Sequence, residues 1–130
     1  MAMNLLVIVD SSEVFGNFAA NLLRPFFQDV LILKTGKELV EHTRLSEVAL
    51  FLLEALLPDS TGFEVAARLR QVLPSVPITI MSFDREYEEL CRSKGFDFVE
   101  KARLSAPTAL SSLHSSFKPQ DQSVNSTTPS

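Results

Sequence analysis

Residues 48–82 read VALFLLEALLPDSTGFEVAARLRQVLPSVPITIMS, and they contain two short apolar runs with an amphipathic stretch between them. The runs at 48–53 and 77–81 have the length and continuous hydrophobicity of strands that are buried on both faces of a parallel sheet. Across residues 62–73 apolar side chains recur at helical spacing, and Pro74 ends the pattern. Because parallel strands need a crossover connection, the stretch predicts a strand–helix–strand unit of an α/β protein.

The same alternation continues on both sides of this unit. Further apolar runs occupy residues 4–9, 29–34 and, more weakly, 95–99. Helical patterns separate the strands, and beyond the first helix they are expected over residues 36–47, 84–94 and 105–117. Five strand–helix repeats predict an open, doubly wound α/β sheet, in which a ligand site lies outside the carboxyl ends of the strands.

The first helix is expected directly after the run at 4–9. One row of apolar residues stands four apart along it: Val14, Phe18, Leu22 and Phe26. A second set widens the same stripe: Phe15, Ala19 and Leu23. Such a stripe is the face that an amphipathic helix turns toward the core, so we expect these residues to pack against the sheet.

Composition limits the classes of function. A length of 130 residues suits one domain, expected over residues 1–117, and the polar segment 118–130 is expected to be a disordered tail or the start of a linker. The net charge of −4 argues against direct nucleic-acid binding, and the single Cys91 cannot form an internal disulfide. Since no apolar run approaches the ~18 residues of a membrane span, we expect a cytoplasmic protein that does not contact membranes.

Four polar side chains stand at the predicted carboxyl ends of strands. Asp10 follows the first strand, Glu54 the third, Ser82 the fourth, and Lys101 the fifth. Each alone is most simply read as solvated surface. Since the ends of parallel strands meet at one edge of the sheet, we expect two carboxylates, a hydroxyl and an ammonium to converge there.

The segments that carry these residues resemble the receiver domain of two-component response regulators. The matching segments are VIVD at 7–10, LLEALLPDSTGFEV at 52–65, PITIMS at 77–82 and GFDFVEK at 95–101. They occur in the family's order and spacing, and the resemblance covers residues 4 to about 117. It implies a flavodoxin-like (βα)5 fold with five parallel strands in the order 2-1-3-4-5, and a signalling module rather than an enzyme.

The resemblance also implies roles for individual residues. Glu54 stands at the phosphoacceptor position, and Asp10, Glu54 and the Leu56 carbonyl would hold Mg²⁺, which prefers oxygen ligands. The metal and Lys101 would offset charge on the transferring phosphoryl group. Ser82 would bind the phosphoryl oxygens, and Ser82 and Phe98 would be the switch residues.

Three departures from the family pattern weaken this chemistry. The acceptor is Glu54 instead of aspartate, so its carboxylate reaches ~1.5 Å further, about one C–C bond. Ser11 replaces the second acid after the first strand, which lowers the expected affinity for Mg²⁺. We therefore expect no cofactor, apart from Mg²⁺ that would bind weakly. Phe83 stands where the family has a small residue, so its phenyl ring is expected to crowd the entrance to the site. We therefore expect Glu54 and Lys101 to form a metal-free ion pair, with Ser82 donating to Glu54.

Three functions remain open at this point. The first is an atypical, phosphorylation-independent receiver that contacts a sensor kinase, an effector domain or another receiver, with a homodimer also open. Its face would be the fourth helix, fifth strand and fifth helix, which offer Tyr87, Arg92, Phe98 and Arg103. The second is an ordinary Mg²⁺-dependent phosphoryl acceptor. The third is another flavodoxin-like small enzyme or nucleotide binder, although no glycine-rich phosphate loop follows the first strand.

Overall fold

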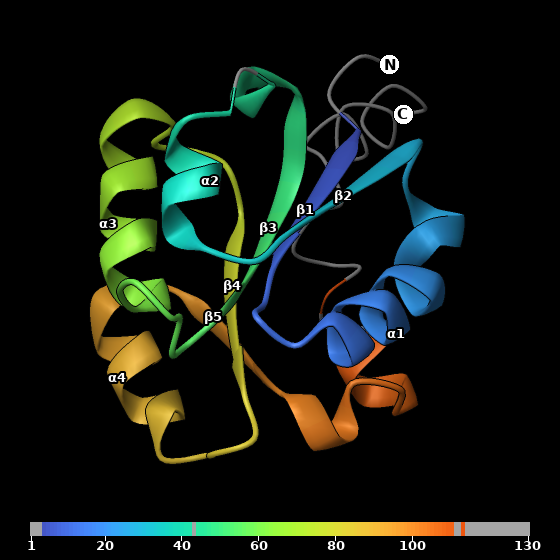
Figure 1. The fold of residues 1–130 in the computed structure, drawn as a ribbon. Coiled ribbons are helices and arrows are strands. Elements are labelled where there is room, and N and C mark those ends of the chain that lie inside the picture. The colour runs from blue at the N-terminus through green and yellow to red at the C-terminus, as the bar shows by residue number, and fades with distance from the viewer. Residues whose placement is uncertain (1–3, 43, 111–112, 114–130) are drawn as a thin grey trace, which may run out of the picture.

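The computed structural model describes residues 4–42, 44–110 and 113, and it contains one sheet of five parallel strands (Figure 1). The strands are β1 (Leu5–Val9), β2 (Asp29–Leu33), β3 (Val48–Glu54), β4 (Ile78–Ser82) and β5 (Asp97–Glu100). Their order is β2-β1-β3-β4-β5, so the predicted fold class and strand order are confirmed. The central strands β1 and β4 are buried along their whole length, as their continuous apolar sequences require.

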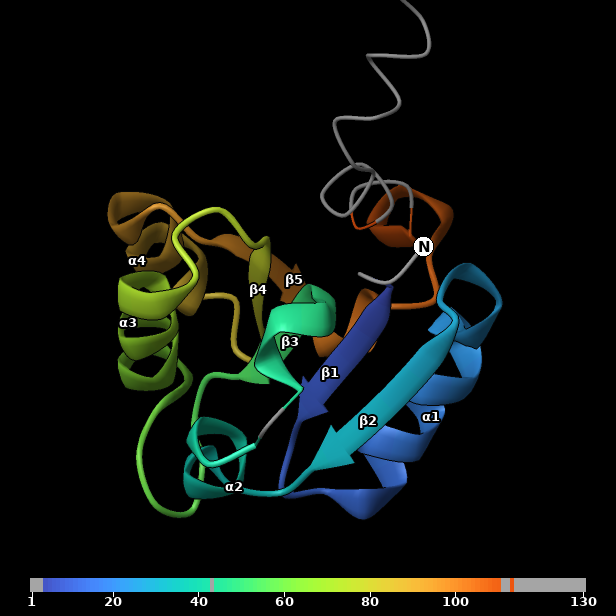
Figure 2. The ribbon, with the colours of Figure 1, turned by 90° about the horizontal axis from the view of Figure 1, so that it is seen from above.

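Helices cover both faces of the sheet (Figures 1 and 2). The α-helices are α1 (Glu13–Leu23), α2 (Gly36–Val40), α3 (Gly62–Val72) and α4 (Tyr87–Lys94). Short 3-10 helices follow at η1 (Arg24–Phe26), η2 (Leu45–Glu47) and η3 (Lys101–Arg103). One core cluster joins α2, α3 and α4 to the sheet, and a second joins α1 and Leu113 to its other face. No helix in the described part of the chain is both long and apolar enough to span a bilayer.

The buried face of α1 differs from the predicted stripe. The helix buries Gly16, Ala19, Ala20 and Leu23, whereas Val14 is 82% and Phe18 is 45% exposed. The cause is the close approach of the helix to the sheet, since a Cβ at Gly16 would lie 3.1 Å from a methyl group of Ile32. Of the predicted stripe, Ala19 and Leu23 are buried and Phe15 and Leu22 pack against the core, whereas Val14 and Phe18 point outward.

The second helix is shorter than predicted. It ends at Val40 instead of residue 47, and residue 43 of the predicted range lies outside the described residues. Leu39 is its one large buried side chain, so little packing extends the helix further. The chain then turns through η2, where Arg44 lies 3.0 Å from a carboxylate oxygen of Asp29 and 3.1 Å from one of Glu47.

The last two helices also begin later than predicted. α4 begins at Tyr87 instead of residue 84, because the Asp84 side chain accepts a hydrogen bond from Glu86 N–H at 2.9 Å and forms a turn first. Residues 107–110 and 113 are helical, and the helix begins at Pro107 instead of residue 105. The rest of the predicted helix to residue 117 and the segment 118–130 lie outside the described residues.

Candidate functional site

The side chain of Lys101 lies at the centre of the carboxyl edge of the sheet. Its Nζ is 2.7 Å from Asp10 Oδ2 and 3.3 Å from Glu54 Oε2. Lys101 is only 4% exposed and Asp10 is fully buried, so the closer ion pair is shielded from solvent. The predicted pair of Glu54 with Lys101 is present, but the shorter contact is to Asp10. Three of the four residues predicted from strand ends therefore meet at one point.

Local backbone contacts hold the two carboxylates in place. Asp10 Oδ1 accepts a hydrogen bond from Ser12 N–H at 2.8 Å, and the Ser12 hydroxyl in turn caps α1. Behind Glu54, Gly62 begins α3 so close to β3 that a Cβ on it would collide with the Glu54 carbonyl. The Gly62 N–H donates to the Ala55 carbonyl at 2.8 Å. The end of β3 is therefore fixed by a contact that only glycine permits.

Two phenyl rings cover the amine. The Lys101 Nζ lies 4.5 Å from the centroid of the Phe15 ring and 5.2 Å from that of the Phe83 ring. Both distances are within the range of cation–π attraction, which strengthens when water is excluded. Phe83 was expected to crowd the entrance. Phe15 was missed because it was taken as one member of a helix stripe, although it stands one turn after the cap at Ser12.

The Glu54 carboxyl is strongly perturbed. Its pKa is raised to about 7, mainly by burial and then by the neighbouring Asp10 carboxyl, while Lys101 opposes the rise. Its Oε1 is buried and has no hydrogen-bond partner, which is costly for an ionised oxygen. Near neutral pH the Glu54 carboxyl therefore exists in both its protonated and its ionised form.

Ser82 is buried at the end of β4, and its hydroxyl oxygen contacts the backbone of the loop that follows. Its Oγ accepts a hydrogen bond from Asp84 N–H at 3.0 Å. Among the described residues no hydrogen bond connects Ser82 to Glu54, so the expected donation is wrong for this conformation. The bond from Asp84 N–H holds the hydroxyl oxygen of Ser82 at the loop that follows β4.

The oxygen atoms available to a metal are few. Asp10 and Glu54 contribute carboxylates, and Leu56 lies in the loop that follows, with its side chain exposed. Ser11 is exposed at the start of α1 and carries no charge. In the described ranges no three residues of the His, Cys, Asp or Glu types gather closely enough to hold a metal ion.

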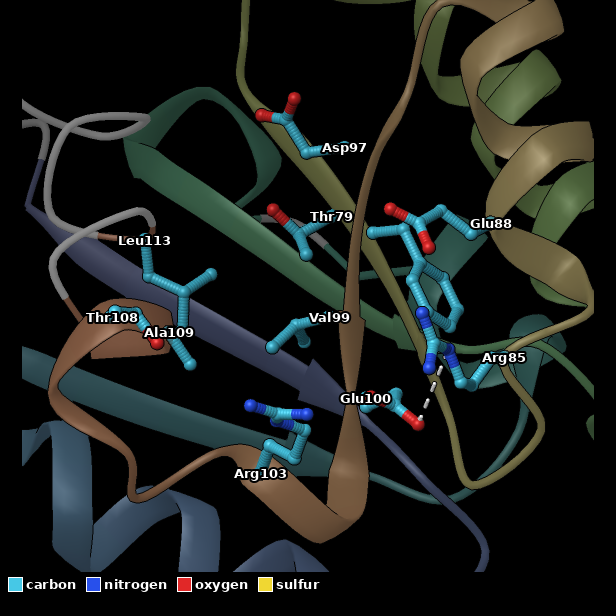
Figure 3. Close-up of a pocket in the computed structure, with 11 residues that line it drawn as sticks. Thr79, Arg85, Glu88, Asp97, Val99, Glu100, Arg103, Thr108, Ala109 and Leu113 are labelled. Atoms are coloured by element: carbon cyan, nitrogen blue, oxygen red, sulfur yellow. Dashed lines mark ion pairs between the residues drawn. The ribbon is translucent and has the colours of Figure 1, made fainter.

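A separate cavity of about 310 Å³ lies around β5, on the side away from β3 (Figure 3). Its lining includes Thr79, Arg85, Phe98, Arg103 and Leu113. Phe98, the predicted switch residue, is half-buried and packs against the core. Of the other residues predicted for this face, Arg92 is exposed and pairs with Glu88 and Glu89, whereas the Tyr87 ring packs 5.8 Å from that of Phe63.

The known proteins that match this chain in sequence or in fold include signalling proteins. No family model matches the sequence. The autoinducer 1 sensor kinase/phosphatase LuxN of Vibrio campbellii is 28% identical over 110 residues, which are 82% of this chain and only 12% of LuxN. A putative response regulator from Chloroflexus aurantiacus shares the fold with a TM-score of 0.78 and 18% identity, over 89% of this chain and 98% of that one.

A third match is the signal receiver domain of an HD domain-containing protein from Pseudomonas fluorescens Pf-5. It has a TM-score of 0.71 and 18% identity, over 96% of this chain and 94% of that chain. The five-stranded parallel sheet with its flanking helices is thus the fold of these signalling domains.

Proposed function

We propose that this chain, a response-regulator receiver domain by fold and by sequence similarity, acts in two-component signal transduction as a protein-interaction module that does not depend on phosphorylation. The observation that supports the proposal most directly is the position of Lys101. Its amine contacts two carboxylates and lies beneath two phenyl rings. Because both rings lie close to the amine, we expect them to hinder a phosphoryl group on residue 54 from approaching Lys101.

We expect Mg²⁺ to bind weakly or not at all, because the residues present do not fit it well. Mg²⁺ favours near-ideal octahedral oxygen coordination with carboxylate ligands. Here Asp10 is paired with Lys101 at 2.7 Å, and the pKa of the Glu54 carboxyl is raised to about 7, which weakens it as a metal ligand near neutral pH. Ser11 offers a hydroxyl in place of a third charge. The cluster is therefore stable without a dication.

We propose that the partner is another protein of a phosphorelay, which could be a sensor kinase, an effector domain or a second receiver. The similarity to part of LuxN, a sensor kinase/phosphatase, supports this class. We propose α4, β5 and the helical residues after Pro107 as the contact face. Its cavity combines the apolar Phe98 with the charged Arg85 and Arg103, a mixture typical of protein interfaces.

Intact-mass spectrometry after incubation with Mg²⁺ and a small acyl phosphate tests the proposal. The matched control is the triple variant Ser11→Asp, Glu54→Asp and Phe83→Ala, which restores the family pattern and opens the entrance. We expect the control to gain one phosphoryl group and the native chain to gain none. A Mg²⁺-dependent phosphoryl group on the native chain that Glu54→Gln removes would overturn the proposal.

A Mg²⁺ titration of backbone amide shifts gives a second, independent readout. We expect the amides around Asp10, Glu54 and Lys101 to stay unchanged at millimolar metal in the native chain and to shift in the triple variant. Saturable shifts in the native chain would favour the ordinary phosphoryl-accepting receiver instead.

A further inference from the structure

A buried hydroxyl group beside β5 has no hydrogen-bond partner. Thr79 lies on β4, where the register of the sheet sets it next to Asp97 of the edge strand β5. The residue is 1% exposed, and its Oγ1 forms no hydrogen bond within the described part of the chain. Because the burial of an unpaired hydroxyl group is unfavourable, a polar contact at this position is left open for a bound molecule.

The same hydroxyl group lines the cavity of about 310 Å³ around β5, and the wall next to it is apolar. Since side chains alternate along a strand, Thr79 and Asp97 face the side of the sheet on which Val99 joins the second core cluster. Ala109 and Leu113 pack on this side as well, and Figure 3 shows them beside Val99. The volume is near the lower limit of ligand pockets, ~300 to 1,000 Å³, so the cavity suits a small molecule.

A guanidinium group lies at the other end of this apolar wall. Arg103 belongs to η3, directly after β5, and its exposed side chain lines the cavity. Figure 3 shows Thr79, Val99 and Arg103 in this order, with the guanidinium group turned toward Val99. Among the described residues no hydrogen bond or ion pair engages this group. Its charge is therefore available to an anion in the cavity.

The acidic residues of the lining leave this charge uncompensated. Two of them already have cationic partners in the chain, and the pairs are Arg85 with Glu100 at 3.9 Å and Arg92 with Glu88 at 3.2 Å. The third, Asp97, lies level with Thr79, at the end of the cavity away from Arg103 (Figure 3). A carboxylate there repels an anionic group, so the Thr79 end favours the neutral end of a ligand and the Arg103 end its charged end.

We propose that this cavity binds a small aliphatic carboxylic acid, with its carboxylate at Arg103, its chain along Val99 and Leu113, and a neutral polar group at Thr79. Guanidinium groups bind carboxylates through charge-assisted hydrogen bonds. The two residues from the level of Asp97 to Val99 span about 7 Å at ~3.3 Å per residue, which a short carbon chain can bridge. Binding requires neither phosphorylation nor a protein partner, although the cavity lies within the face proposed for partner contact.

Titration of the whole chain with hydroxyhexanoate that carries its hydroxyl on the terminal carbon, followed by backbone amide shifts, tests the proposal. We expect saturable shifts at Thr79, Val99 and Arg103, with a dissociation constant on the order of 1 mM because so small a ligand has few contacts. Hexanoate, which lacks the hydroxyl, should bind about fivefold more weakly. Hexanol and hexylamine, which lack the carboxylate, should bind roughly tenfold more weakly still or not at all.

Variants at the two ends of the cavity assign the contacts. Arg103→Gln should weaken both acids roughly tenfold or more, whereas Arg68→Gln, an exposed position on α3, should leave them unchanged. Thr79→Val should weaken hydroxyhexanoate about fivefold and leave hexanoate unchanged, since it removes only the hydroxyl group. Thr79→Ser keeps the hydroxyl group and should bind like the native chain. Thermal melting of each variant without ligand checks the fold, and Thr79→Val should melt higher because it removes an unpaired buried group.

Three results would overturn the proposal. The first is the absence of saturable shifts at these residues up to about 20 mM hydroxyhexanoate, well above the expected dissociation constant. The second is hexanol binding as tightly as hexanoate, which would indicate a merely apolar hollow. The third is an affinity for hydroxyhexanoate that neither Arg103→Gln nor Thr79→Val lowers. Because Glu54 takes no part in this titration, its outcome and that of the phosphorylation assay are independent.

Discussion

Replacement of Glu54 by glutamine removes one titrating group from the centre of the site and keeps its shape. The native carboxyl has its pKa raised from 4.5 to about 7, first by burial and then by Asp10. In the unfolded chain the same group ionises near its ordinary value. Between these two values the folded state keeps a proton that the unfolded state has lost. The native chain should therefore lose stability as the pH rises from 4.5 to 7, and the loss should level off above 7.

The size of the loss follows from the same pKa values. At about 1.4 kcal/mol per pH unit, a pKa raised from 4.5 to about 7 sets an upper limit of roughly 3 kcal/mol. The Glu54 side chain is 22% exposed, so solvent screens part of this effect. We expect a loss of about 1 to 2 kcal/mol in the free energy of unfolding. Glutamine is neutral at every pH, so Glu54→Gln should not show this loss.

Urea unfolding of the native chain and of Glu54→Gln at pH 4.5, 5.5, 6.5 and 7.5, steps of about one pH unit, measures the difference directly. All other titrating groups are shared, so the difference between the two chains isolates Glu54. We expect Glu54→Gln to become the more stable of the pair as the pH rises. Parallel profiles for the two chains would refute the placement of Glu54 in a buried site beside a second carboxylate.

Three further changes test other contacts of the structure. Lys101→Met should lower the free energy of unfolding in urea by about 3 to 5 kcal/mol, because the fully buried Asp10 carboxylate loses its partner. A loss below about 1 kcal/mol would show that the amine lies elsewhere. Gly62→Ala should destabilise the chain, because the added Cβ collides with the β3 backbone. Gly95→Ala meets no neighbouring atom but has a φ of 83°, so it should cost only about 1 kcal/mol. Equal losses of stability for the two variants in thermal melts would contradict this. Asp59→Ala should increase amide exchange in α2, because its carboxylate accepts two backbone hydrogen bonds at the beginning of that helix. Unchanged exchange would place Asp59 away from α2.

The strands could be predicted from the sequence because each is a continuous apolar run between polar segments. Helix bounds were predicted less well, because turns fixed by single side chains determine them. The turn at Asp84 moves the beginning of α4 to Tyr87, and Asp59 accepts a hydrogen bond at the beginning of α2. Arg44 pairs with Asp29 in the turn that follows α2. None of these residues belongs to a helical pattern in the sequence. Val14 and Phe18 on α1 were wrongly predicted to face the core, because periodicity alone does not distinguish a core face from an exposed apolar face.

The convergence of Asp10, Glu54 and Lys101 could be predicted from topology, since strand ends of a parallel sheet share an edge. The order of the distances could not be predicted, because it depends on where the backbone after β1 holds Asp10. Phe15 was missed for a similar reason. Its role depends on the rotation of α1 about its axis, which the small residues at Gly16 and Ala19 determine by their packing.

The covered amine at the strand ends also has a consequence for protein chemistry. Acyl transfer to lysine requires an uncharged nitrogen that the reagent can reach. The Lys101 side chain is 2% exposed, and its Nζ lies 2.7 Å from a carboxylate oxygen of Asp10. Reagents that acetylate amines, acyl phosphates among them, will therefore label the exposed Lys34, Lys37 and Lys94 and leave this residue unlabelled as long as the chain stays folded. Labelling at position 101 is thus a chemical reporter for the opening of the two phenyl rings.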